Sequence, residues 1–135
     1  MSGLANYAMQ KALYSALSGD STLGGLIEGV YDYVPADAAF PYVTIGDVRG
    51  EDVSTMGQEA ARLQMELHVY SRTRGRKECM DILSRILELL HENEPEADGH
   101  RVVSLRYTGS EVALERDGLT YHGKMRLSAL MAATA

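Results

Sequence analysis

Cysteine, tryptophan, phenylalanine and long apolar runs are scarce in this sequence of 135 residues. Cys79 is the only cysteine, so the chain forms no internal disulfide, and its cysteine usage fits a reducing compartment. The absence of tryptophan weakens the case for a site that stacks sugars or nucleobases. No apolar run approaches the roughly 20 residues that cross a bilayer, and no charged region precedes an apolar one at the N-terminus. We therefore expect a soluble, unsecreted protein.

Positive charge is also in short supply. The chain has 13 Lys and Arg residues against 19 Asp and Glu residues, which gives a net charge of −6 at pH 7. A free-standing nucleic-acid binder usually carries a basic surface, so this balance disfavours that class. The length predicts a single domain over residues 1–135, and 45% hydrophobic residues is ordinary for a globular protein.

Motifs of catalytic or metal chemistry are missing from the sequence. It has no HExxH or Cys/His ligand spacing and no GxSxG nucleophile elbow, and its one basic loop lacks the ending of a phosphate-binding P-loop. His68 and His122 lie on the polar sides of two predicted strands, which favours solvated histidines over ligands or general bases. Cys79 lies on the apolar stripe of a predicted helix, so we expect a buried structural thiol. We expect no enzymatic activity, no metal and no cofactor.

The stretch from Leu63 to Glu92 predicts the core of the fold. Residues Leu63–Tyr70 alternate between apolar and polar side chains, the period of two that indicates a half-buried strand. From Lys77 to His91 the apolar residues recur with helical spacing. The predicted stripe comprises Cys79, Ile82, Leu83, Ile86, Leu87 and Leu90.

The segment before this core predicts a first helix and two strands. Leu4–Leu17 has an apolar face at helical spacing, while Tyr7 and Tyr14 lie off that face, either at the edge of the core or in a subunit contact. Further expected elements are a short apolar turn at Leu23–Ile27, an edge strand at Val30–Val34, a buried Phe40 and a strand at Tyr42–Ile45.

The C-terminal part predicts strands only. Arg101–Thr108 alternates with Val103, Leu105 and Tyr107 on one face, and Val112–Leu114 forms a short strand of its own. Asp117-Gly118 is a hairpin signal, and Leu119–Met131 is a long strand. The order α-β-β-β-α-β-β-β predicts an α+β fold, in which two helices pack on a single antiparallel or mixed sheet of five to six strands.

Two charged segments lie outside these patterns. Gly46–Ala61 has no sustained period, so it is either a functional or mobile loop or an extended hairpin with solvated sides. Its charged residues are Asp47, Arg49, Glu51, Asp52 and Glu59. The other segment carries Arg72, Arg74, Arg76 and Lys77 at a helix N-terminus, where cations oppose the helix dipole. It favours an anionic partner, or a solvated loop paired with acidic residues of the same chain.

Several segments, in this order along nearly the whole chain, resemble the tail-completion, or tail-terminator, proteins of long-tailed phages and gene transfer agents. The matching pieces are Leu13–Ser18, Val30–Pro35, Phe40–Gly46, Leu67–Arg72 followed by Gly75-Arg76, and Asp117–Gly123.

The resemblance implies a mechanical role without catalytic residues. Such proteins form a ring, typically a hexamer, at the head-proximal end of the tail tube in the virion, after assembly in the host cytoplasm. The ring stops tube-protein addition and binds a head-completion, or stopper, protein. Genome DNA passes through its pore without specific binding, and no membrane is involved. The alternative is another head–tail connector, a stopper or adaptor on the portal side.

The charge and the two segments suggest how such a ring is built. Six copies carry a formal charge of roughly −36, which would let DNA slide past an acidic lumen. We expect the basic segment Arg72–Lys77, with Tyr7 and Tyr14, at a subunit interface. Its acidic counterpart is Gly46–Ala61 or Glu92–Asp98. The charged residues of Gly46–Ala61 are also the expected docking loop for the tube or another partner.

Overall fold

The computed structural model describes residues 3–92 and 97–134. Three helices and five strands follow one another along the chain. They are α1 (Ala5–Ser18), α2 (Ser21–Gly24), β1 (Gly29–Tyr31), β2 (Tyr42–Asp52), β3 (Ala60–Ser71), α3 (Lys77–Glu92), β4 (His100–Leu114) and β5 (Tyr121–Ala133). The predicted α+β class is confirmed, with the strand count at five.

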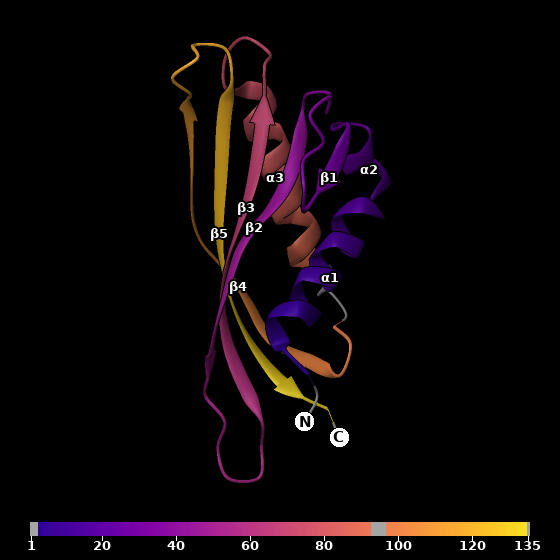
Figure 1. The fold of residues 1–135 in the computed structure, drawn as a ribbon, viewed down its shortest axis with the longest axis vertical. Coiled ribbons are helices and arrows are strands. Elements are labelled where there is room, and N and C mark those ends of the chain that lie inside the picture. The colour runs from indigo at the N-terminus through magenta and orange to yellow at the C-terminus, as the bar shows by residue number, and fades with distance from the viewer. Residues whose placement is uncertain (1–2, 93–96, 135) are drawn as a thin grey trace.

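The five strands form one mixed sheet in the order β1-β2-β3-β5-β4. β1 runs parallel to β2, and all other neighbours are antiparallel. Helices α1 and α3 lie on the same face of the sheet, and the β2–β3 hairpin extends beyond them at one end of the molecule (Figure 1). The β3–α3 and β4–β5 loops lie at the opposite end.

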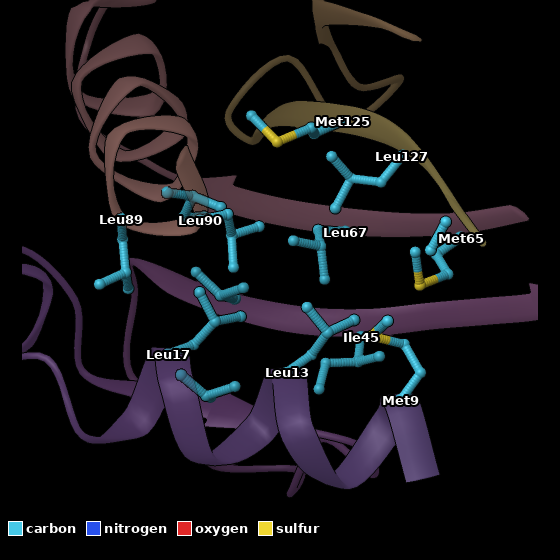
Figure 2. Close-up of a cluster of buried hydrophobic side chains, with 14 of the residues drawn as sticks. Met9, Leu13, Leu17, Ile45, Met65, Leu67, Leu89, Leu90, Met125 and Leu127 are labelled. Atoms are coloured by element: carbon cyan, nitrogen blue, oxygen red, sulfur yellow. The ribbon is translucent and has the colours of Figure 1, made fainter. Parts of the chain in front are cut away.

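The core fills the space between the two helices and the sheet. Met9, Leu13 and Leu17 point from α1 toward the strands, as Figure 2 shows. They meet inward-facing side chains of β2, β3 and β5, namely Ile45, Met65, Leu67, Met125 and Leu127. Because successive side chains of a strand point to opposite sides, every second residue of β3 and β5 is buried. The alternation predicted for these two strands is confirmed.

The other side of the sheet, here called the open face, carries the remaining alternate side chains. In register they are Tyr42, Thr44, Arg49 and Glu51 on β2; Ala60, Arg62, Gln64, Glu66, His68 and Tyr70 on β3; and His122, Lys124, Arg126, Ser128, Leu130 and Ala132 on β5. On β4 they are Arg101, Ser104, Arg106 and Glu111. These side chains are mostly polar, and no helix of the described residues covers them, so the sheet has one apolar and one polar side.

β4 differs from its prediction. It is one strand of 15 residues, whereas two separate strands were expected. Register shifts lie between Val102 and Ser104 and between Tyr107 and Gly109. Each bulge adds an unpaired residue and breaks the period of two. Val102 is therefore the buried residue. Val103, which was predicted to share a face with Leu105 and Tyr107, lies unpaired in the bulge and is 42% exposed, so that prediction was wrong for Val103.

Smaller differences concern single positions. On α3, Leu89 is buried and Leu87 reaches the surface, because the helix faces β4 as well as β3 and β5. Phe40 is partly exposed rather than buried, with the Arg72 guanidinium 4.1 Å from its ring centroid. The edge strand β1 ends at Tyr31, three residues before Val34.

For two segments, Leu23–Ile27 and Gly46–Ala61, the sequence had left the secondary structure open. The turn expected at Leu23–Ile27 begins with the short helix α2, which Asp20 caps by accepting a hydrogen bond of 2.9 Å from the backbone N–H of Leu23. Of the two interpretations of Gly46–Ala61, the structure shows the extended hairpin, because β2 continues to Asp52 and β3 starts at Ala60.

Candidate interaction surfaces

The predicted docking residues separate into two places. Glu51, Asp52 and Glu59 are exposed near the end of the β2–β3 hairpin, beyond which Met56 is fully exposed. Asp47 and Arg49 lie on β2 at a greater distance from the hairpin end. They line a groove of about 430 Å³ on the open face, together with Gln64, Glu66, Thr108, Arg126 and Ser128. The hairpin end and this groove are therefore two distinct surfaces.

Hydrogen bonds hold the hairpin end in shape. The backbone N–H and the hydroxyl of Ser54 donate to the Asp52 carboxylate at 3.1 and 2.6 Å, and these two bonds lower the pKa of Asp52. Thr55 and Gln58 form an isolated antiparallel β-bridge across the turn that contains Gly57, whose positive φ of 88° suits glycine. An ordered turn thus presents the side chain of Met56 to solvent.

The basic loop lies at the opposite end of the molecule and is tied to its own chain. Arg72 donates from Nε to the Thr120 hydroxyl at 3.1 Å and lies over Phe40. Arg76 lies over the ring of Tyr121 at 5.4 Å, and Lys77 pairs with Asp81 at 2.7 Å. The lysine contact is one of the pairings expected for a solvated loop.

Asp117 organises the neighbouring β4–β5 loop. Its carboxylate accepts hydrogen bonds from the backbone N–H groups of Thr120 and Leu119, each at 2.9 Å, and from the Thr120 hydroxyl at 2.7 Å. These bonds lower the pKa of Asp117 to about 2. The predicted hairpin turn is confirmed, with Gly118 at a positive φ of 71°. The loop and Arg72 border a shallow groove of about 430 Å³ over Tyr42 and Tyr70.

Tyr7 and Tyr14 project from the outer side of α1, 60% and 46% exposed. They line a pocket of about 340 Å³ whose residues do not include the basic loop. Lys11 lies over the Tyr7 ring at 4.6 Å and pairs with Asp98 at 2.9 Å. The structure therefore places these tyrosines apart from Arg72–Lys77. Of the acidic segment Glu92–Asp98, residues 93–96 lie outside the described part of the chain.

The two strand histidines are neighbours on the open face, because β3 pairs with β5. His68 Nδ1 and His122 Nε2 are 2.7 Å apart, and His122 Nδ1 lies 3.0 Å from the Glu115 carboxylate. Burial, and then the nearby His122, lower the pKa of His68. Tyr42, Tyr70 and the two histidines form a stacked row of rings across β2, β3 and β5, which the sequence analysis missed because it depends on strand register.

Reactive groups in the described residues are few. Burial raises the pKa of Cys79 to about 11, so its thiolate is disfavoured near neutral pH. Within residues 3–92 and 97–134 no three His, Cys, Asp or Glu side chains gather as a metal site would need. No helix of that part is long and apolar enough to cross a membrane.

Comparison with known proteins decides the family. The model of the family described as tail completion protein gp17 matches residues 11–132. The chain belongs to this family. The tail completion protein gp17 of Bacillus phage SPP1 is 31% identical over 124 residues, which cover 92% of each chain. The predicted resemblance is confirmed, and a structural role in tail completion and virion assembly follows from membership in the gp17 family.

Two solved structures agree with this fold. The structure of the SPP1 gp17 protein matches with a TM-score of 0.66 and 29% identity over 94% of both chains. A chain in the virion of a native gene transfer agent particle matches with a TM-score of 0.87, covering 97% of this chain and 100% of that one. The latter is only 20% identical, so it supports the shared fold alone.

Proposed function

We propose that this gp17-family protein forms a ring of six copies that closes the head-proximal end of the tail tube. The ring stops further addition of tube protein and presents its other side to a head-completion protein, and genome DNA passes through its pore. The observation that carries this proposal is the family match over residues 11–132. The shape of the molecule supports it, because the two ends differ from each other and so do the two flanks.

The two flanks supply the contacts that a ring needs. A ring closes through heterologous contacts, in which one patch of a subunit binds a different patch of the next. One flank carries Leu4, Tyr7 and Tyr14, exposed on the helix that packs over β1 and β2. At the other edge of the sheet, β4 exposes Val103 and Tyr107. Exposed aromatic and aliphatic side chains gathered on a surface favour protein contacts, so we assign these patches to neighbouring subunits.

The two ends then face the tail and the head. The hairpin end, with Glu51, Asp52, Glu59 and the exposed Met56, protrudes from the body and is assigned to the tail tube. Arg72, Arg76 and Lys77 bind their own chain at the opposite end, so we assign the basic loop to the head side, although a reach to the next subunit was expected from the sequence.

The ring is tested by placing a charge on each flank. Tyr14→Arg on α1 and Tyr107→Arg on β4 should each shift the protein toward the monomer when its mass is measured by sedimentation, alone and with the tail-tube protein. Met80→Arg is the matched control, because Met80 is half-exposed and belongs to α3, not to α1 or β4. Assemblies of unchanged mass in both flank variants would disprove these contacts.

The terminating role needs a separate measurement. Tail-tube protein polymerised with the purified chain should give shorter tubes, and particles that lack the chain should carry overlong tubes in electron micrographs. Unchanged tube lengths, with co-purification of a portal-side protein in place of tube protein, would instead identify the chain as a stopper or adaptor.

A further inference from the structure

The open face of the sheet carries a band of arginines, none of which forms an ion pair with an acidic side chain of the described residues. Arg49, Gln64, Ser128 and Arg106 stand side by side across β2, β3, β5 and β4 in the strand register. Arg62 and Arg101 lie nearby on the same face, toward the hairpin end. In the described part of the chain none of these four arginines has an ion-pair partner, whereas Lys124 pairs with Glu66 and Arg126 with Glu111.

The local charge is opposite to that of the whole chain. Between the paired residues Glu111 and Lys124 at one end and Arg101 and Ala132 at the other, the open face carries six cationic side chains. They are Arg49, Arg62, Arg101, Arg106, Lys124 and Arg126. The acidic ones there are Asp47, Glu51, Glu66 and Glu111, so this part of the face carries about two positive charges on a chain whose net charge is −6, and Glu115, beside His122, lies outside it. An excess of arginine on a polar, solvent-facing sheet favours a polyanionic partner.

The open face also lacks what a protein partner needs. Within the described residues, no large hydrophobic side chain that is strongly exposed lies on β2, β3 or β5. Those on β4 are Val103 at a bulge, and Tyr107 and Leu114 in register with inward-facing residues of β5. Stable protein contacts usually centre on buried aromatic or aliphatic anchors. Contacts with nucleic-acid phosphates instead use arginine and polar groups such as those of Gln64 and Ser128.

We propose that the open face lines the pore of the ring and that its arginine band contacts the phosphates of passing duplex DNA. This inference rests on the proposed ring. There the flanks bind neighbours, the ends bind tail and head, and the helices cover the opposite side of the sheet. It differs from the acidic lumen expected from the net charge. Contacts of this kind are weak, independent of sequence and sensitive to salt.

The test measures DNA binding by the purified chain, because the band is present on a single copy. Fluorescence anisotropy of a short labelled duplex should show affinity falling about 50-fold between 50 and 150 mM salt if four arginines contact phosphates. The double variant R49Q/R106Q keeps two contacts, so the same change in salt should weaken its binding only about 7-fold. R74Q/R76Q is the matched control: it removes two charges from the basic loop and should behave like the unmodified chain.

Each outcome decides between explanations. No measurable binding, an unchanged salt dependence in R49Q/R106Q, or a loss of DNA binding in R74Q/R76Q would overturn the inference. So would an R49Q/R106Q variant that binds DNA normally but no longer binds tail-tube protein, since the band would then serve a protein. Sedimentation of R49Q/R106Q is measured in parallel and should match the unmodified chain. If the band binds DNA while no ring forms under any condition, the proposed ring fails and the DNA surface stands.

Discussion

The close approach of α3 to the sheet at Gly123 gives a sharp test of the packing. Gly123 on β5 lies directly beneath the helix. A methyl group added there would lie 2.5 Å from Cys79 Sγ and 3.0 Å from Leu83 Cδ1. Both neighbours are buried, so neither moves freely. Gly123→Ala should therefore lower the free energy of unfolding by about 1–3 kcal/mol, the usual cost of overpacking a core.

A second substitution should relieve this clash. Cys79→Ala removes the sulfur and by itself should cost about 1 kcal/mol, as for loss of a similarly small buried group. In the double variant the added methyl group occupies the space that the sulfur leaves. The double variant should thus unfold at about the same free energy as Cys79→Ala alone, which is a coupling of about 1–3 kcal/mol between the two sites.

Urea and thermal unfolding, followed by circular dichroism, measure these differences. For a chain of this length, each kcal/mol corresponds to a shift of about 3–5 °C in Tm. Gly109→Ala on β4 is the control, because its added methyl group would meet nothing closer than 3.9 Å, and it should change stability little. Costs that simply add in the double variant, or a Gly123→Ala variant as stable as the control, would refute this account of the helix–sheet contact.

Two further predictions concern charges. Asp20 and Arg85 form two hydrogen bonds of 2.9 Å with side chains only 13% and 17% exposed, and Asp20 also caps α2. Asp20→Ala removes both the pair and the cap and should lower Tm clearly, whereas Asp81→Ala, which breaks an exposed pair with Lys77, should leave Tm within error. Equal effects of the two would show that burial does not govern these pairs. Because burial and His122 lower the pKa of His68, the unfolded chain binds a proton more readily there, and stability should fall as the pH drops below about 6.5. Denaturation at pH 7.5 and 5.5 should show that the free energy of unfolding declines less in His68→Gln than in the unmodified chain. An equal decline in both would assign the pH dependence to other groups.

Local sequence patterns determined most of the elements. The strand at Leu63–Tyr70 and the helix from Lys77 were predicted because one face of each must be apolar to reach a core. The turn at Asp117-Gly118 was predicted because a positive φ suits glycine. The ordered set of segments also led to the gp17 family, since family resemblance depends on sequence and not on contacts.

Tertiary structure decided what depends on strand register and on neighbours distant in sequence. The bulge between Val102 and Ser104 placed Val102 in the core and left Val103 exposed, because one inserted residue shifts the alternation of side chains by one position. The arginine band, likewise, joins residues from four strands whose pairing no local pattern specifies. A net charge of −6 could be read from the composition, but its division between a basic open face and an acidic remainder required knowing which residues stand side by side.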